Sequence, residues 1–171
     1  APLINYGQST SISGAVSSKK PGETVSIYGQ PYGQVSPVKL ADVLTTTNGV
    51  WAYPVKPTLL TYYTAHWKNL VSQQVGVQMR PTIMWSTNKL FGSVVVKSDR
   101  SLTGRKVYLQ KFTRFGQWVK IKGVILGRAS HSYFRLKLAP GRYQLRIFMS
   151  YNQVGAGYLD GISRTVTYTR K

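Results

Sequence analysis

The chain has 171 residues, 42% of them apolar, with 23 basic and four acidic side chains and a formal net charge of +19. This apolar content is typical of globular proteins and excludes a disordered chain. The absence of cysteine excludes a disulfide framework, thiolate zinc sites and a cysteine nucleophile, and no apolar run reaches the roughly 18 residues that would predict a transmembrane helix.

The first half of the chain predicts short β-strands and no helix, because its apolar residues alternate and show no period of 3.6. A turn sequence at 19–22 separates the first two strands. The dipeptide Asn48-Gly49 accepts two positive φ values and predicts a tight hairpin in which 50–55 pairs with 38–45. The expected strands are 9–16, 24–28, 38–45, 50–55, 57–67 and 71–79.

A boundary between two domains is predicted where the alternation of Val75, Val77 and Met79 ends at a proline. Pro81 lacks a backbone donor and keeps Arg80 extended. No flexible Gly/Ser-rich tether lies here, so we expect a stiff joint. The predicted domains are residues 1–80 and 81–171.

The second half repeats the same spacing of strands and turns. Its expected strands are 83–85, 90–96, 105–112, 116–126, 132–138, 142–148 and 162–168. Short strands at regular intervals, with Gly and Pro turns between them, are typical of β-sandwiches. The predicted fold is therefore all-β, with two tandem immunoglobulin-like antiparallel β-sandwiches.

Three stretches of the first half, PGETVSIY, TTNGVW and TYYTAHW, resemble the immunoglobulin-like and fibronectin type III-like repeats of secreted bacterial surface proteins. The second half, with GRKVYLQ, GQWVKIKGV and APGRYQLRI, is similar to a companion domain that often follows such a repeat. The likeness is to the cysteine-free variety. It implies a secreted or cell-surface location and a structural or adhesive role, and its motifs carry no catalytic residue.

The residues that could support catalysis do not form a set. A glycosidase needs two carboxylates within about 10 Å, and the four acidic residues are dispersed. Neither His66 nor His131 accompanies a nucleophile elbow, and no cluster of metal ligands occurs. We therefore predict no enzyme activity, no cofactor, no metal site and no small-molecule substrate. The acidic residues are Glu23, Asp42, Asp99 and Asp160.

The positive charge is concentrated in the second half. Up to and including Arg80 there are six basic and two acidic residues, a net charge of +4, whereas the remainder has 17 basic and two acidic residues, a net charge of +15. Such a density attracts nucleic acid, anionic cell-wall polymer or a membrane surface. The alternative is that the charge serves solubility alone.

Strand alternation locates a candidate site for an anionic polymer. With Val119 and Ile121 directed inward, the neighbouring side chains of that strand face outward, and the alternation at 142–148 likewise directs its arginines outward. Immunoglobulin-like topology places the two strands in one sheet. A β-bulge would reverse the direction of the tryptophan. The predicted polyanion-binding residues are Trp118, Lys120, Lys122, Arg142 and Arg146.

These patterns predict a non-catalytic secreted or cell-surface module, structural or adhesive, whose second domain contacts an anionic extracellular polymer such as a cell-wall glycopolymer. The alternative is an intracellular nucleic-acid-binding protein that uses the basic second domain. A signal peptide encoded upstream of residue 1 would favour the first function, and its absence the second.

Overall fold

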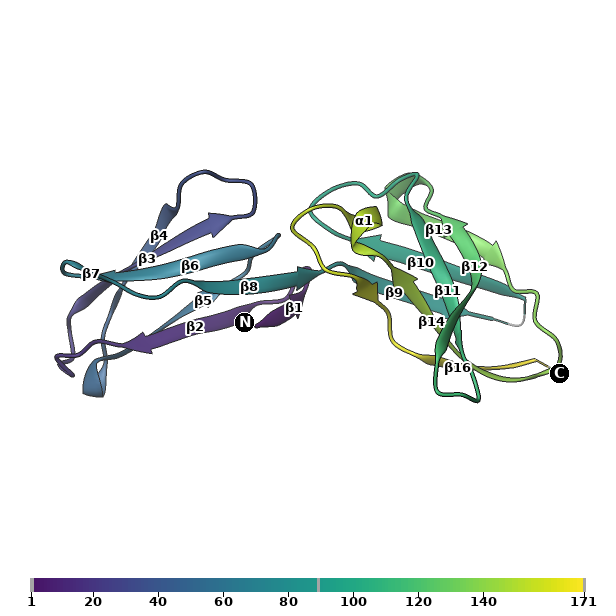
Figure 1. The fold of residues 1–171 in the computed structure, drawn as a ribbon, viewed down its shortest axis with the longest axis horizontal. Helices are drawn as coiled ribbons and strands as arrows, with labels where there is room; N and C mark the ends of the chain where they lie inside the picture. The colour runs from purple at the N-terminus through teal and green to yellow at the C-terminus, as the bar shows by residue number, and fades with distance from the viewer. Residues whose placement is uncertain (1, 89, 171) are drawn as a thin grey trace. The chain divides into compact units, whose positions relative to one another are not determined.

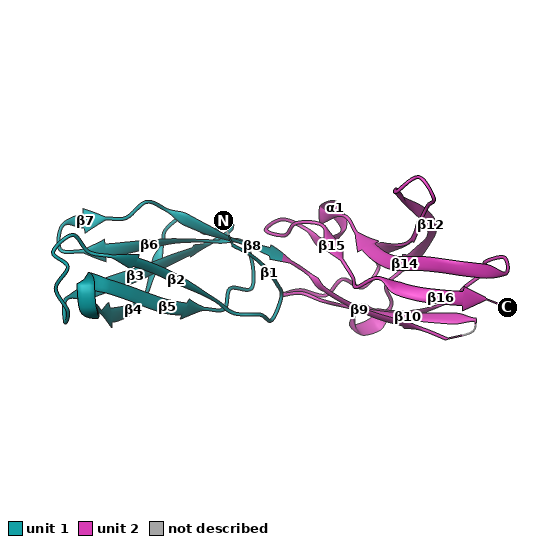
Figure 2. Ribbon diagram, turned by 90° about the horizontal axis from the view of Figure 1, so that it is seen from below, with its two compact units in different colours: residues 1–79 teal, residues 80–171 magenta. Residues whose placement is uncertain are grey.

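The computed structural model describes residues 2–88 and 90–170, and the chain divides into two compact units (Figures 1 and 2). Unit 1 is Ala1–Met79 and unit 2 is Arg80–Lys171. Each unit consists of antiparallel strands arranged in two sheets, with only short helical turns between them. The prediction of an all-β fold with two tandem sandwiches is confirmed.

Unit 1 places a two-stranded sheet against a larger one. The larger sheet has the order β1-β8-β6-β3-β4, with β7 beside β6, and the smaller sheet pairs β2 with β5. The elements are β1 (Leu3–Asn5), β2 (Thr10–Ala15), β3 (Thr24–Pro31), β4 (Val38–Leu44), the 3₁₀ turn η1 (Thr47–Gly49), β5 (Val50–Val55), β6 (Thr61–Trp67), β7 (Leu70–Val71) and β8 (Val75–Arg80).

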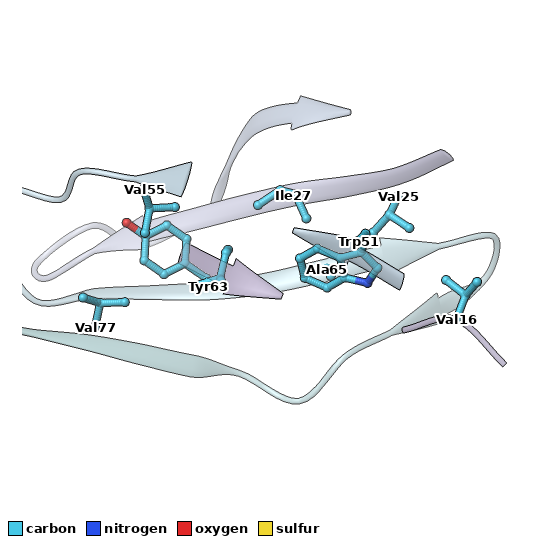
Figure 3. Packing of buried hydrophobic residues seen from close by; sticks show 9 residues of the cluster. Val16, Val25, Ile27, Trp51, Val55, Tyr63, Ala65 and Val77 are labelled. Carbon is cyan, nitrogen blue, oxygen red and sulfur yellow. The ribbon is translucent and has the colours of Figure 1, made fainter. Parts of the chain in front are cut away.

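The core of unit 1 lies between these two sheets. Alternate residues of each strand enter it, as their period of two requires: Val25 and Ile27 from β3, Tyr63 and Ala65 from β6, and Trp51 from β5. Figure 3 shows these side chains directed into the space between the strands. Burial of apolar area of this kind is the main term that stabilises the fold.

The predicted hairpin at Asn48-Gly49 is wrong in its pairing, although both residues have the expected positive φ, 61° and 70°. Strand β5 pairs with β2, with Gly14 opposite Trp51, and β4 pairs with β3. The turn therefore carries the chain from the larger sheet to the smaller one. This crossing places Trp51 and Val55 over the face of the larger sheet, where they are buried.

Unit 2 has a three-stranded sheet, β13-β10-β9, and a five-stranded sheet, β12-β11-β14, in which β15 and β16 both pair with β14. Val94 and Val96 of the first sheet and Leu109 and Ile147 of the second are buried. The elements are β9 (Thr82–Thr87), β10 (Phe91–Lys97), β11 (Lys106–Phe112), β12 (Trp118–Ile125), the 3₁₀ turn η2 (Arg128–Ser130), β13 (His131–Arg135), β14 (Gly141–Met149), α1 (Tyr151–Val154), β15 (Gly161–Ile162) and β16 (Val166–Arg170).

The turns η1 and η2 share one backbone conformation with different residues. In η1 the two positive-φ positions are Asn48 and Gly49, whereas in η2 they are Ala129 and Ser130, at 55° and 56°. An alanine in the left-handed region costs about 1–2 kcal/mol, and asparagine tolerates it better. We expect Ala129→Asn, which copies Asn48, to stabilise unit 2 by about 1 kcal/mol and to raise its melting temperature by about 4–8 °C.

Calorimetry of the full chain measures this change. The matched control is Ala139→Asn, at an exposed loop position without a positive φ, and it should leave the melting temperature unchanged. Equal shifts for the two variants would contradict the assignment of strain to Ala129.

Candidate functional site

Three neighbouring strands of unit 2 bring basic and aromatic side chains onto one surface. The register places Lys120 of β12 opposite Gln110 of β11, and Gln110 opposite Arg146 of β14. Residues directly opposite one another point to the same side of a sheet, and the adjacent Leu109 and Ile147 fill the core on the other side. We call the outward surface the cationic face. It consists of Tyr108, Gln110, Trp118, Lys120, Arg146 and Phe148.

Arg146 is held in place by two neighbours. Its Nε donates a hydrogen bond of 2.8 Å to Oε1 of Gln110, and its Cζ lies 4.1 Å from the centroid of the Trp118 ring. Gln110 itself is 6% exposed, so the acceptor is fixed. Burial lowers the pKa of the Arg146 guanidinium, but an arginine still remains protonated at neutral pH. The geometry therefore presents a positioned cation.

Lys120 lies over the other aromatic rings of the face. Its Nζ is 4.4 Å from the Tyr108 centroid and 5.8 Å from the Phe148 centroid. Each such cation–π contact contributes about 0.5–1 kcal/mol at an exposed site. Lys120 thus extends from β12 towards β14, whereas Arg146 extends from β14 towards β12. The two side chains cross β11 in opposite directions, on either side of Gln110.

Both acidic side chains of unit 2 are engaged elsewhere. Asp99 pairs with Arg100 at 2.8 Å, and Asp160 accepts a hydrogen bond from the backbone N of Tyr151. Within residues 90–170, therefore, no carboxylate pairs with Lys120 or Arg146. Aromatic rings and an amide position these two cations without neutralising their charge, which leaves the face free to attract an anion.

The expectation that Lys122 lies beside Lys120 is corrected. A β-bulge leaves Ile121 without a cross-strand partner, so that Lys122 falls opposite the buried Leu109, on the side of Val124. An extra residue in a strand reverses the direction of every side chain after it. Ile121, which was expected in the core, is the residue without a cross-strand partner and is 36% exposed. Val119 precedes the bulge and lies opposite Lys111, on the side of Leu109 as expected, but it is also 36% exposed.

Arg142 and Trp118 both face outward, as predicted, with different consequences. Arg142 pairs with Thr169 and lies four residues from Arg146, about 13 Å along the strand, so it flanks the cationic face without joining it. The Trp118 ring is in contact with Arg146 and with Phe112, whose centroid is 5.1 Å away. Trp118 therefore positions a cation and offers little open surface for stacking a ligand.

Sequence reasoning missed Tyr108, Gln110 and Phe148 as members of the face. Alternation along 105–112 does direct Tyr108 and Gln110 outward. Their partnership with Lys120 and Arg146 depends on the register between strands, which alternation within one strand does not contain.

Both histidines lie near a serine, but neither forms the hydrogen-bond chain of a serine triad within the described residues. His66 lies opposite Ser26, whose Oγ donates a hydrogen bond of 2.5 Å to Oδ1 of Asp42, so this carboxylate is bonded to the serine and does not orient the histidine. His66 stacks on Tyr28, with centroids 4.3 Å apart, and His131 Nε2 lies 3.0 Å from Ser93 Oγ. A serine triad also needs a carboxylate that orients the histidine, and both carboxylates of unit 2 have the other partners described above. Over the described residues no group of three or more metal-ligating side chains occurs, and no helix is long and apolar enough to cross a membrane.

Unit 2 has the strand order of an immunoglobulin-like sandwich. Unit 1 has the same kind of strand order, with a smaller second sheet. The sequence matches no protein-family model and no curated protein. Solved structures with a similar fold include the chicken interferon gamma receptor alpha chain, with 9% identity, a TM-score of 0.44 and coverage of 91% of this chain and 87% of that one.

Two further solved structures cover 98% of this chain at 12% identity. They are the FN1–FN3 domains of chicken CNTN1, with a TM-score of 0.32 and 64% of that chain covered, and Escherichia coli alpha-2-macroglobulin activated by porcine elastase, with a TM-score of 0.37 and 19% covered. At this level of similarity the comparisons carry no argument about function.

Proposed function

We propose that the protein is a non-catalytic extracellular module, structural or adhesive, whose unit 2 binds an anionic polymer through the cationic face. The observation that supports this proposal most directly is the pair formed by Lys120 and Arg146. Both are held on aromatic rings of one sheet surface, and neither has a carboxylate partner in the described part of unit 2.

Positioned cations favour binding because less side-chain entropy is lost when the ligand arrives. Immobilising a flexible side chain costs about 0.5–1.5 kcal/mol, and the rings of Tyr108 and Trp118 already restrict Lys120 and Arg146. The excess of 15 positive charges over residues 81–171 adds long-range attraction for any polymer with repeated carboxylates or phosphates.

The contacts of Trp118 favour an anionic glycopolymer over a single-stranded nucleic acid. Proteins that bind single strands gain about 1–3 kcal/mol for each base stacked on an aromatic ring. Here the Trp118 ring is already in contact with Arg146 and Phe112. Recognition on this face is therefore electrostatic, with stacking as a minor contribution.

The extracellular location is part of the same proposal. The turn and core motifs of the first half resemble those of secreted bacterial repeats, and they occur in an immunoglobulin-like sandwich. Unit 1, with little net charge, would act as a spacer. A signal peptide encoded upstream of residue 1 would support this location, and its absence would favour the intracellular alternative.

Charge reversal of the pair tests the polymer site. We expect Lys120→Glu with Arg146→Glu to weaken binding to polyglycerol phosphate and to a polyuronate by about 100-fold, since two charge-assisted contacts are lost. Calorimetric titration at several salt concentrations measures the change. If the polymer resembles nucleic acid in its charge density, the slope of log K against log salt should fall by about 1.4–1.8.

The matched control is Arg135→Glu with Lys137→Glu, two exposed cations in or just after β13, outside the sheet that carries the cationic face. It changes the net charge equally, and we expect it to weaken binding only about threefold, through the general field. Equal losses of affinity for the two double variants would show that binding depends on the net charge and not on the cationic face. Tighter binding of single-stranded DNA than of either polymer would favour the nucleic-acid alternative.

A further inference from the structure

A groove runs along the free edge of β2 in unit 1. Its volume is about 400 Å³, and β2 with the following residues to Ser17 forms one wall. The segment that includes Leu70, Val71 and Val75 forms the other wall, and these three side chains are exposed. Trp51 and Ala65, which belong to the core in Figure 3, lie at its floor. The groove is thus an apolar cleft that opens beside a strand edge.

The backbone of β2 has unpaired groups at this edge. Among the described strands β2 pairs with β5 alone. Val16 N donates to Gly49 O, so the even-numbered residues of β2 are hydrogen-bonded to β5 and the odd-numbered ones are directed away from it. Pro54, which has no N–H, lies opposite Ser11 and fits this pattern. The N–H and C=O groups of Ser11, Ser13 and Ala15 therefore face the groove side.

A second polar group of the groove also lacks a partner. Trp67 lines the groove, and its Nε1 is buried without a hydrogen-bond partner within the described part of the chain. A buried donor left unpaired is unfavourable, and a backbone carbonyl is its most common partner in proteins. The groove thus combines apolar walls with donors and acceptors that suit a polypeptide backbone.

Unit 2 shows what covers the corresponding edge there. Strand β10 pairs with β13 as β2 pairs with β5, and the other edge of β10 is covered by β9 in antiparallel register. Ile83 and Trp85, two residues apart on β9, pack into the core. In unit 1 the first strand, β1, pairs with β8 and leaves β2 uncovered. The occupant of such an edge is therefore an extended strand with bulky apolar residues at alternate positions.

We propose that the free edge of β2 binds an extended peptide segment of another protein by antiparallel strand addition, with two bulky apolar side chains in the groove and acidic residues at its N-terminal end. The N-terminus of an antiparallel strand would lie beyond Val16, where the exposed Lys19 and Lys20 follow β2. Strand addition to an exposed sheet edge is an established mode of peptide recognition.

The charge of the chain also argues against a second copy as the occupant. Each copy carries a net charge of +19, so two copies repel one another. Lys68, near the same end of the groove, already pairs with Glu23 at 3.2 Å, so Lys19 and Lys20 supply the available attraction for a carboxylate. This inference concerns unit 1 and is independent of the polymer site in unit 2.

The test uses a synthetic peptide with the sequence of β9, TIMWST, preceded by two glutamates and acetylated. We add it to the ¹⁵N-labelled full chain and follow amide resonances and hydrogen exchange. The expected result is a shift and slower exchange at Ser11, Ser13 and Ala15, with a shift of the Trp67 indole N–H. The amides of Ile12 and Gly14, already bonded to β5, should change less.

Ser13→Pro removes one N–H from the free edge, a change that an edge strand tolerates. We expect this substitution to lower the affinity for the peptide about tenfold, whereas Ser13→Ala should bind the peptide as tightly as the parent protein does. Should Ser13→Pro disturb the spectrum of unit 1, Val71→Glu replaces it, because a carboxylate in the apolar wall also opposes binding.

Three outcomes would overturn the proposal. One is a set of shifts confined to unit 2, and another is equal binding by the parent, Ser13→Pro and Val71→Glu. The third is protection of the Ser11, Ser13 and Ala15 amides from hydrogen exchange in the peptide-free protein, if that protection increases with protein concentration. Such a result would identify a second copy of the chain as the occupant. A peptide with lysines in place of the glutamates should bind more weakly, and equal binding would refute the role of Lys19 and Lys20.

Discussion

Replacement of Trp85 by alanine is expected to destabilise unit 2 strongly, while the stability of unit 1 stays unchanged. Trp85 is 4% exposed, and its Nε1 donates a hydrogen bond of 3.0 Å to the backbone O of Arg164. A buried tryptophan replaced by alanine costs about 3–5 kcal/mol, and the carbonyl of Arg164 also loses its partner. A domain of this size has about 5–10 kcal/mol of net stability, so the loss is a large part of the total.

Amide spectra of the labelled chain at increasing urea concentration follow the two units separately. The control is Met84→Ala on the same strand, where the side chain is 45% exposed and the expected change is about 0.5 kcal/mol. Similar urea midpoints for Trp85→Ala and Met84→Ala would contradict the role of β9 as the covering strand of unit 2. If unit 1 of Trp85→Ala unfolds at the same urea concentration as unit 2, the two units do not unfold independently, and the prediction is contradicted.

Alternation within single strands predicted the core of unit 2 well. Val107, Leu109, Leu145 and Ile147 were expected to point inward, and each is buried to 1% exposure or less. The reason is local, because successive side chains of a strand must point to opposite faces. Wherever a strand has one buried face, its own sequence contains that information.

Pairing and register were beyond what the sequence could predict. The partner of Val50–Val55 is β2, some 40 residues earlier in the chain, and a tight turn before the strand gave the wrong partner. The bulge at Ile121 moved Lys122 to the other side of β12. Both errors arise because contacts between strands are made by residues distant in sequence, and a shift of one residue reverses every side chain.

The candidate site was predicted in part for the same reason. Trp118, Lys120 and Arg146 lie together, since each follows the alternation of its own strand up to the bulge. The groups that position them, Tyr108 and Gln110, come from β11, which lies between the two strands. Only the register shows that this middle strand supplies partners for both cations.

In each unit an aromatic ring packs directly on a glycine of the neighbouring strand. In unit 1, Gly14 lies opposite Trp51, and a Cβ at Gly14 would be 2.8 Å from the indole ring. In unit 2, Gly92 lies opposite Phe134, and a Cβ there would be 2.4 Å from the ring. In each unit a ring covers the glycine backbone, so the absence of a side chain is what allows the aromatic residue to enter the core.

Gly92→Ala is therefore expected to destabilise unit 2 by about 2 kcal/mol, because the buried Phe134 ring must move to admit the methyl group. The matched control is Gly123→Ala on β12, where the new Cβ would lie 3.5 Å from Lys106 in ordinary contact and the change should be neutral or slightly stabilising. Urea unfolding measures both. In a Phe134→Ala background the penalty of Gly92→Ala should vanish, a coupling of about 2 kcal/mol, whereas additive effects of the two substitutions would show that the clash with Phe134 is not its cause.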